Sequence, residues 1–347
     1  MYNKSDMNEK AIARVIAEHK GLYEVKNADG EYHAKVTGKR MHEASSREDY
    51  PAVGDWVKIA PLGDGQAVIL DVLPRRTMIK RRHGDRTTEG RKDETQIIAT
   101  NIDVAFVVES VDRDYSLNRF ERYFALARSG GVEPAIIVNK IDCISGEELE
   151  HRLAAMRERF PSTDIITTST VNNEGLRRLR EYISPGKTYC FLGSSGVGKS
   201  SLINALLGCA VVRTGNISEY SNRGKHITTA RQMYFLENGG IVIDNPGMRE
   251  VGLADAGEGI EISFDKLSDL SRTCKYSDCT HTNEPGCTVI SALKTGQIDE
   301  NRYENYLNLR KEAAHNELGK VDKKEKDRRF GKFLKSAKKD LKRLDCL

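Results

Sequence analysis

The stretch 191–201, Phe-Leu-Gly-Ser-Ser-Gly-Val-Gly-Lys-Ser-Ser, constrains this chain more strongly than any other. Its first glycine is followed after four residues by Gly-Lys-Ser, the pattern of a loop that binds phosphate groups between a strand and a helix. The flanking residues suit that setting, because Thr188–Leu192 predicts a buried strand and Leu202–Leu207 an amphipathic helix. Glycine lets the backbone point successive N–H groups at one anion, with the positive helix end behind them. A glycine-rich turn with a chance lysine is the alternative, and it leaves the complete pattern unexplained.

The pattern assigns a role to each part of this loop. Lys199 is expected along the β- and γ-phosphates of a nucleotide, and the Ser200 hydroxyl is expected to ligate Mg²⁺. The expected phosphate contacts are Gly193, Ser194, Ser195, Gly196, Val197, Gly198, Lys199, Ser200 and Ser201.

Length and charge narrow the class of protein. The 347 residues suffice for two or three domains, and the hydrophobic fraction of 38% supports sizeable cores. No apolar run predicts a membrane span and the polar start does not resemble a signal peptide, so we expect a cytoplasmic monomer with no membrane partner. The net charge of +4 is uneven, because residues 320–347 carry twelve Lys and Arg against five Asp and Glu, a local +7. A basic end on a near-neutral body favours contact with a polyanion such as RNA.

The N-terminal region predicts a barrel. Five short strands without helical periodicity favour a small closed barrel of the OB type over residues 1–75, which commonly binds oligonucleotides. The strand count leaves an SH3-like barrel and a purely structural cap open. Residues 76–95 are rich in Arg and Lys and predict a basic linker, either solvated or in contact with phosphate. The expected strands are Ala11–Ala17, Leu22–Val25, Glu31–Val36, Asp55–Ile59 and Ala67–Leu73.

Residues 96–255 predict an α/β domain. Continuous apolar strands, such as Val104–Val108 and Pro134–Val138, alternate there with helical segments, such as Leu117–Ser129. This alternation favours a parallel sheet covered on both faces.

One of these strands runs into the tetrapeptide Asn-Lys-Ile-Asp at 139–142. In GTP-binding proteins, Asn-Lys-x-Asp at the carboxyl end of a strand recognises guanine. A carboxylate accepts hydrogen bonds from the ring N–H and the exocyclic amino group of guanine, and adenine offers no matching pair of donors. Asp142 is expected to make this contact, while Asn139 and Lys140 shape the pocket. Ser169 follows the next strand and is expected in a second base-contacting loop.

A further nucleotide motif follows the phosphate loop. Ile241–Ile243 predicts a strand that ends at Asp244, and Gly247 follows. In GTPases this position supplies an Asp that orders Mg²⁺ through water and a Gly whose amide contacts the γ-phosphate. The guanine-reading residues precede the phosphate loop by more than fifty residues, so the chain is circularly permuted relative to ordinary GTPases. The expected switch segments, 215–229 and 244–252, then lie just before the C-terminal region.

The C-terminal region carries a metal pattern. Cys274, Cys279, His281 and Cys287 lie within fourteen residues and can close a tetrahedron around one Zn²⁺. Four protein ligands leave no position for a reactive water, so the expected zinc is structural; coincidental free cysteines are the alternative. We expect a helical zinc domain over 256–347, whose basic tail is either a helix that orders on RNA or a solvated lysine face.

Together these features closely resemble the ribosome small subunit-dependent GTPase A family, also called RsgA or YjeQ. The resemblance covers about residues 10–320 and includes the barrel and the Cys-x4-Cys-x-His-x5-Cys cluster. Its permuted motifs lie at 139–142, 193–201, 223–229 and 244–250. The resemblance implies a GTPase that binds the small ribosomal subunit late in maturation, contacts its 16S rRNA through the barrel and zinc domain, and leaves after subunit-stimulated GTP hydrolysis.

The resemblance also assigns residues in the loop after the phosphate loop. Thr229 is the expected switch threonine and Mg²⁺ ligand, with Thr228 beside it as a nucleotide contact. His226 is expected to position the attacking water, since Met248 stands where a Ras-like enzyme carries glutamine. A surface histidine without chemistry is the alternative. The family usually has threonine where this chain has Asn245, which leaves regulation and paralogue identity open.

Two other classes of function remain beside a ribosome-assembly GTPase. One is an rRNA-binding module that GTP switches with little hydrolysis, or a paralogue with a different ribosomal target. The other is an ATPase or kinase built on the same phosphate loop, and the tetrapeptide at 139–142 argues against it.

Overall fold

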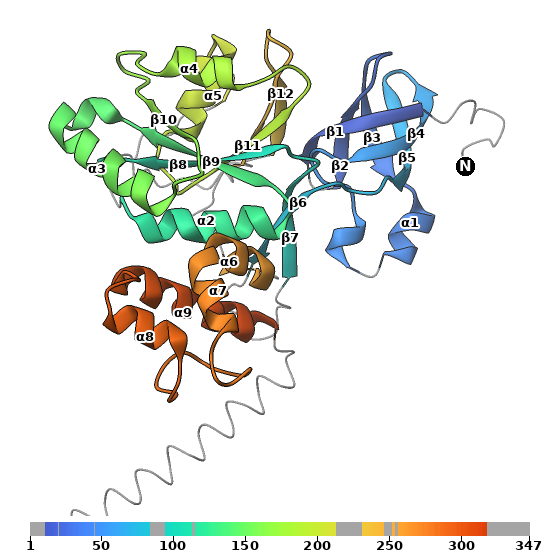
Figure 1. The fold of residues 1–347 in the computed structure, drawn as a ribbon. Helices are drawn as coiled ribbons and strands as arrows, with labels where there is room; N and C mark the ends of the chain where they lie inside the picture. Colours follow the sequence, from blue (N-terminus) through green and yellow to red (C-terminus); the bar gives the residue numbers. More distant parts are fainter. Residues whose placement is uncertain are drawn as a thin grey trace, which may run out of the picture.

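The computed structural model describes residues 11–19, 21–44, 46–83, 94–112, 115–212, 231–245, 252–253 and 256–317. These residues form an N-terminal barrel, a central sheet with helices on both faces, and a group of C-terminal helices below that sheet (Figure 1). Within these ranges, every helix is too short or too polar to cross a bilayer.

The barrel closes because its first strand pairs with both the second and the fourth. The strand order is β1-β2-β3-β5-β4, with β3 and β5 parallel and the other neighbours antiparallel. Val15, Val57 and Ile59 are completely buried at its centre. The expected closed five-stranded barrel is confirmed, with α1 (Gly38–Glu43) and the 3-10 helix η2 (Arg47–Asp49) between β3 and β4. Its strands are β1 (Ala11–His19), β2 (Leu22–Lys26), β3 (Glu31–Val36), β4 (Trp56–Gly63) and β5 (Gln66–Val72).

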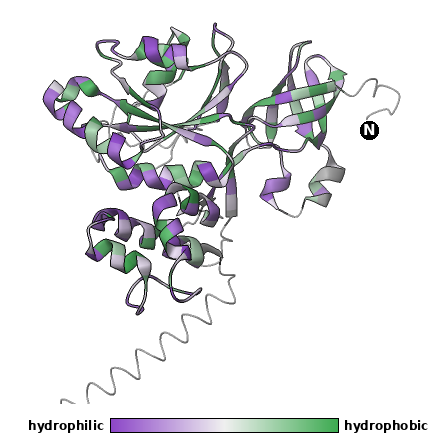
Figure 2. Ribbon diagram, in the orientation of Figure 1, coloured by the Kyte–Doolittle hydropathy of each residue, from purple (hydrophilic) through white to green (hydrophobic). Residues whose placement is uncertain are grey.

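The central sheet has the order β10-β9-β8-β11-β13-β12. All neighbours are parallel except β12, which runs antiparallel to β13. Hydrophobic residues concentrate in these strands (Figure 2). The carboxyl ends of the parallel strands therefore meet at one edge, where ligands of such sheets bind. The strands are β8 (Val104–Ser110), β9 (Glu133–Asn139), β10 (Ile165–Thr168), β11 (Thr188–Leu192), β12 (Gln232–Phe235) and β13 (Ile241–Asp244).

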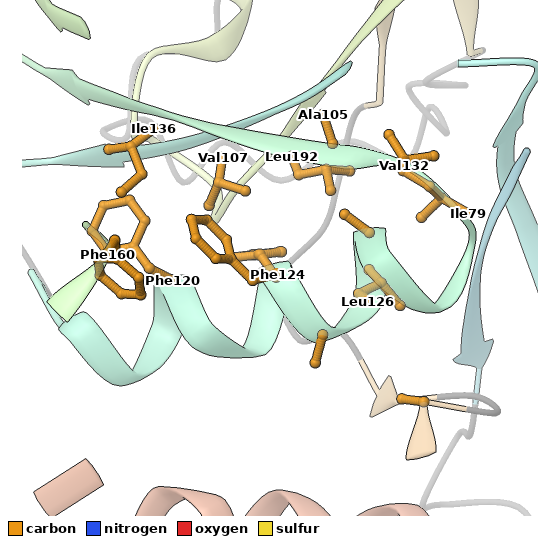
Figure 3. Close-up of a cluster of buried hydrophobic side chains, with 14 of the residues drawn as sticks. Ile79, Ala105, Val107, Phe120, Phe124, Leu126, Val132, Ile136, Phe160 and Leu192 are labelled. Carbon is orange, nitrogen blue, oxygen red and sulfur yellow. The ribbon is translucent and has the colours of Figure 1, made fainter. Parts of the chain in front are cut away.

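Helices cover both faces of this sheet, as the apolar strands predict. Successive residues of a strand point to opposite faces, so Val107 joins the core under α2 and α3 while Phe106 joins the core under α4 and α5. Phe120 and Phe124 of α2 point towards Val107 and Ile136 of the sheet (Figure 3). The helices are α2 (Leu117–Ser129), α3 (Gly146–Arg159), α4 (Leu176–Tyr182) and α5 (Lys199–Leu207).

The barrel and the central sheet are joined through the backbone and a buried arginine. Strand β12 pairs with β1 at Ala17 and Gln232. The guanidinium of Arg14 donates to the carbonyl of Asn101 at 3.1 Å and to the Thr188 hydroxyl at 2.9 Å. Burial lowers the pKa of Arg14 to about 10. These contacts tie a barrel strand to the strand that enters the phosphate loop.

The segment expected as a basic linker contains a strand. Met78–His83 (β6) pairs antiparallel with Glu94–Thr100 (β7), and Gly252–Leu253 (β14) adds to the other edge of β6. Ile79 is completely buried in the main core. The many Lys and Arg residues around Ile79 predict a linker, whereas the packing of Ile79 in the core stabilises a strand.

Among the described residues, α6 to α9 form the C-terminal group, which lies below α2 (Figure 1). Gly259 of α6 meets α2 so closely that an added Cβ would lie 2.0 Å from the carbonyl oxygen of Ala125. The helices are α6 (Gly257–Ser263), α7 (Asp265–Arg272), α8 (Thr288–Lys294) and α9 (Glu300–Glu317).

The close approach of α6 to α2 predicts a strong effect of Gly259→Ala. The added methyl group has to push the two helices apart, and we expect a loss of about 1–3 kcal/mol in the free energy of unfolding measured in urea. Gly146→Ala is the matched control, since a Cβ at Gly146 of α3 meets nothing within 4 Å. Equal stability of the two variants would contradict this packing.

Candidate functional site

The phosphate loop lies at the carboxyl end of β11, between β8 and β13, and leads into α5. Gly193 has a φ of 145° and Gly198 a φ of 98°, backbone conformations that favour glycine. A Cβ at Gly193 would lie 2.2 Å from the carbonyl oxygen of Val108. The first glycine is thus required for the loop to pass close to the neighbouring strand, and the loop sits where ligands of parallel sheets bind.

Lys199 is almost fully buried at the start of α5. Its ammonium group donates to the carbonyl oxygens of Gly193 at 2.6 Å and Ser194 at 2.7 Å. Burial lowers the pKa of Lys199 to about 8, and the carboxylates of Asp244 and Glu109 oppose that shift. The loop backbone therefore holds the Lys199 ammonium group inside the phosphate loop, where the phosphates are expected to bind.

Asp244 ends β13 beside this cation. Burial raises the pKa of the Asp244 carboxyl, and Lys199 opposes the shift. Its Oδ1 atom is buried and has no hydrogen-bond donor among the described residues. Such an oxygen, together with the hydroxyl of Ser200 in the first turn of α5, fits the hard oxygen ligands and bound water that Mg²⁺ prefers.

Asn139 joins the guanine-reading segment to the phosphate loop. Its side chain is buried at the end of β9, and Nδ2 donates to the carbonyl oxygen of Val197 at 2.8 Å. Its Oδ1 accepts from the Thr168 hydroxyl at 3.0 Å. A Cβ at Gly198 would lie 2.2 Å from Nδ2 of Asn139, so a glycine is also required directly before Lys199. One side chain thus connects the ends of β9 and β10 with the loop after β11.

The other expected base-contacting residues lie along the same edge. Lys140 has a left-handed backbone with φ 61°, and its ammonium group forms a 2.8 Å ion pair with Asp112. Asp142 follows in the 3-10 helix η3 (Ile141–Cys143) and is exposed. Ser169 is buried, and its hydroxyl accepts from the backbone N–H of Val171 at 3.1 Å. Asp142 is available to a ligand, whereas Ser169 shapes its own loop.

Three residues near the phosphate loop were missed by the sequence analysis. Glu109 is buried near the end of β8, and Arg119 of α2 donates to it at 3.1 Å. Tyr123, one turn further along α2, is buried, and burial raises its pKa to about 12. The sequence did offer one signal, because Glu109 is a carboxylate near the carboxyl end of an apolar strand. The carboxyl ends of the parallel strands carry the other site residues.

Asn245, the departure from the family pattern, is buried. Its Nδ2 donates to the thiol sulfur of Cys190 at 3.4 Å. Burial raises the pKa of the Cys190 thiol. The remaining expected residues of this site, His226, Thr228, Thr229 and Gly247, lie outside the described residues.

The structure brings the four expected metal ligands together. Their ligand atoms all lie within 4.8 Å of one another. The Sγ atoms of Cys274 and Cys287 are 3.8 Å apart, and His281 Nδ1 lies 3.6 Å and 3.5 Å from them. Zinc bonds of about 2.3 Å to sulfur and about 2.0 Å to nitrogen imply tetrahedron edges of about 3.8 Å and 3.5 Å. The cluster, completed by Cys279, therefore fits a four-coordinate Zn²⁺.

The loop that carries these ligands is held by hydrogen bonds of its own. Glu284 accepts from the backbone N–H groups of Thr280 at 2.9 Å and Thr282 at 3.0 Å. The carbonyl oxygen of His281 accepts from the Tyr303 hydroxyl of α9 at 2.6 Å. The ligand loop is therefore bonded to the helix that packs below α2.

Replacing Lys199 by Met should change how stability depends on pH. Burial disfavours the charged amine in the folded chain. Lys199 therefore lowers the free energy of unfolding of the wild type in full at pH values below its folded-state pKa of about 8. The penalty should fade as pH rises from about 8 to the ordinary value of 10.5, where the unfolded chain also loses its proton. In urea unfolding without nucleotide, the gain of Lys199→Met over wild type should shrink across this window. The exposed Lys187→Met is the control, and a gain that grows with pH would contradict the assignment.

Metal removal should unfold the C-terminal ligand loop. We expect about one zinc per chain by elemental analysis, and less than a tenth of that in Cys287→Ser. Cys209→Ser, at an exposed cysteine outside the cluster, is the control and should keep its zinc. A protein that purifies without metal and melts at the same temperature after chelation would rule out a structural zinc.

A family model described as RsgA GTPase matches residues 72–254. A model described as ABC transporter also matches, over residues 176–335. That second match contains the phosphate loop, which both classes of protein share, but excludes the guanine-reading tetrapeptide at 139–142.

Known proteins resemble the chain over most of its length. The small ribosomal subunit biogenesis GTPase RsgA 1 of Bacteroides thetaiotaomicron is 36% identical, over 96% of this chain and 92% of its own length. The crystal structure of YjeQ from Thermotoga maritima matches with a TM-score of 0.64 at 27% identity, covering 87% of this chain and 97% of that one. YloQ, a circularly permuted GTPase, matches in fold with a TM-score of 0.62 at 21% identity, covering 92% of this chain and 100% of that one. The expected permuted fold is thus confirmed, and the chain belongs to the RsgA GTPase family.

Proposed function

We propose that this protein hydrolyses GTP on the small ribosomal subunit and acts in late maturation of that subunit. The observation that carries the proposal is Asn139, whose side chain joins the guanine-reading segment to the phosphate loop at 2.8 Å. A single nucleotide can therefore contact both motifs. The subunit as partner is supported by the relative from Bacteroides thetaiotaomicron, a small ribosomal subunit biogenesis GTPase.

In this proposal, each motif contacts one part of GTP. Asp142 accepts from the guanine ring N–H and amino group, because its carboxylate is exposed beside the buried Asn139. Lys199 moves its two hydrogen bonds from loop carbonyls to the β- and γ-phosphates. Further contacts come from Lys140, Ser169, Gly193, Ser194, Ser195, Gly196, Val197, Gly198, Ser200, Ser201, Thr228, Thr229 and Gly247.

The expected Mg²⁺ ligands are the hydroxyls of Ser200 and Thr229, with Asp244 accepting from a metal-bound water. Bound Mg²⁺ neutralises charge that develops on the phosphates. The buried Asp244 oxygen, which has no donor within the part of the chain that the structure describes, supports this assignment. Gly247 donates its amide to the γ-phosphate and so distinguishes GTP from GDP.

His226 is proposed to orient the attacking water, since Met248 provides no hydrogen bond in the position of the Ras glutamine. Phosphoryl transfer depends mainly on an aligned water and on stabilisation of the charge on the phosphates, and little on covalent catalysis. The subunit would complete the site by bringing His226 into position, so the free protein should be slow.

We also propose that 16S rRNA is bound by the parts of the chain outside the nucleotide-binding unit. The barrel of residues 1–75, the basic segment 76–95 and the zinc domain of 256–347 flank the nucleotide-binding unit of 96–255. Zinc has a structural part in this scheme, and the protein acts as a monomer. RNA contact through Lys and Arg should weaken steeply as salt rises.

Replacing Asp142 by Asn should shift base preference from guanine to xanthine. Xanthine has a carbonyl where guanine has its exocyclic amino group, so the amide of Asn donates where Asp accepted. We expect GDP to bind at least tenfold more weakly and xanthosine diphosphate more tightly, by competition with a fluorescent nucleotide. Asp112→Asn, at the partner of Lys140, is the nearby control. Unchanged guanine affinity would exclude Asp142 as the base-contacting residue.

Small subunits should stimulate phosphate release by orders of magnitude, and His226→Ala should lose most of that stimulation while keeping GDP affinity. Purified 30S and 50S particles, tested separately with GTP, measure both effects, and His315→Ala serves as a control histidine in α9. Equal stimulation by 50S particles would refute the proposed partner. If the 30S particle binds only in the presence of GTP and does not speed phosphate release, the result would favour an RNA-binding module that GTP switches.

A further inference from the structure

The residue after Asp244 is a buried amide whose place in the site is not yet explained. Asn245 is 1% exposed, so its side chain lies in the interior of the protein. Its Nδ2 donates to the thiol sulfur of Cys190 at 3.4 Å, and its Oδ1 has no donor among the described residues. A polar group in the core costs free energy unless it is bonded, so this amide has a reason to keep its contact with the sulfur.

The pairing of β11 with β13 explains how this contact forms. Cys190 lies directly opposite Ile243 in this parallel pair. Asn245 comes two residues after Ile243, so its side chain leaves the sheet on the same face as the thiol of Cys190. The amide nitrogen lies one bond further from the backbone than a threonine hydroxyl would. The side chain of Asn245 can therefore reach back to the sulfur, which the threonine usual in the family is too short to do.

The sheet separates Asn245 from the residue before it. Cys190 belongs to the core under α2 and α3, whereas its neighbour Phe191 belongs to the core under α4 and α5. Side chains alternate along a strand, so Asn245 points into the first of these cores and Asp244 points to the face of α5. Helix α5 carries Ser200 in its first turn. The amide therefore holds the end of β13 from one face while the Asp244 carboxylate lies on the face of the proposed magnesium site.

Strand β11 gives this contact a fixed partner. Cys190 is completely buried, and its strand lies between β8 and β13 in the sheet. Burial raises the pKa of the Cys190 thiol, so the sulfur stays neutral beside the amide. The same strand ends at Leu192, directly before the first glycine of the phosphate loop. The contact between Asn245 and Cys190 thus fixes the end of β13 relative to the strand that enters this loop.

We propose that Asn245 is a positioning residue for Asp244, and that its amide acts through Cys190 to fix the Asp244 carboxylate relative to the phosphate loop. The proposal rests on the proposed site for nucleotide and Mg²⁺ and deepens it. Without the sulfur, the amide stays buried and loses this partner, so the end of β13 has to shift. Because Asp244 is expected to accept from a metal-bound water, this shift weakens Mg²⁺ binding and leaves the direct contacts of the loop with the nucleotide intact.

Release of a fluorescent GDP analogue from the full-length protein, measured over a range of free Mg²⁺ concentrations, tests this role. Asn245→Thr installs a hydroxyl that does not reach the sulfur, and Cys190→Ala removes the sulfur. In both variants, the Mg²⁺ concentration that slows release by half should rise about 2- to 10-fold, the effect of one lost hydrogen bond. In EDTA, both should release the nucleotide at the wild-type rate. Should Cys190→Ala not fold, Cys190→Val removes the same sulfur and fills the space.

The double variant should need no more Mg²⁺ than the more affected single variant, because both substitutions remove the same contact. Ile243→Val is the matched control, since it trims the residue paired with Cys190 and keeps both the amide and the sulfur. This control should lower the melting temperature and leave the Mg²⁺ requirement as in the wild type. A purely structural role of Asn245 would give the same result as the control.

A wild-type Mg²⁺ requirement in Asn245→Thr or in Cys190→Ala overturns the proposed positioning role. An equal shift in Ile243→Val, or a matching change of the release rate in EDTA, overturns it as well, because either would mark a general effect of packing. These results would leave the proposed function untouched, since Mg²⁺ would still slow release from the wild type. Failure of the wild type to bind GDP, or release that does not depend on Mg²⁺, would instead contradict the proposed nucleotide site and this role with it.

Discussion

A single buried amide connects the three segments of the proposed nucleotide site. Asn139 lies at the end of one strand, yet it donates to the carbonyl of Val197 in the phosphate loop and accepts from Thr168 at the end of a third strand. The chain order of the motifs is permuted, so the loop that Asn139 contacts comes 58 residues later. Because the parallel sheet brings the carboxyl ends of its strands to one edge, the order of the motifs does not matter for the site that they form.

Charge burial at this edge fits a nucleotide bound together with Mg²⁺. Lys199, Asp244 and Glu109 are all buried there, and burial alone disfavours the charged form of each. Lys199 and the two carboxylates compensate one another in part. A nucleotide with Mg²⁺ adds phosphate charge beside the Lys199 ammonium and a cation beside Asp244, whose buried Oδ1 atom has no donor among the described residues.

The local patterns predict most of the fold and part of the site. Leu117–Ser129 was predicted as a helix with the bounds that α2 has, because an apolar stripe of helical period is a local property. The four residues of the metal-ligand cluster were equally clear from their spacing. Strand β6 was missed because its charges mask the buried Ile79. Glu109 and Arg119 were missed because their ion pair depends on how α2 packs against β8, and no local pattern encodes that.

A structure of the protein crystallised with GDP and Mg²⁺ tests the central claim most directly, that permuted segments converge on one nucleotide. The account predicts that both carboxylate oxygens of Asp142 lie within hydrogen-bonding distance of the guanine ring nitrogen and amino group, and that the Lys199 ammonium contacts the β-phosphate. Guanine bound away from Asp142, or phosphates outside the loop that Asn139 contacts, would contradict it.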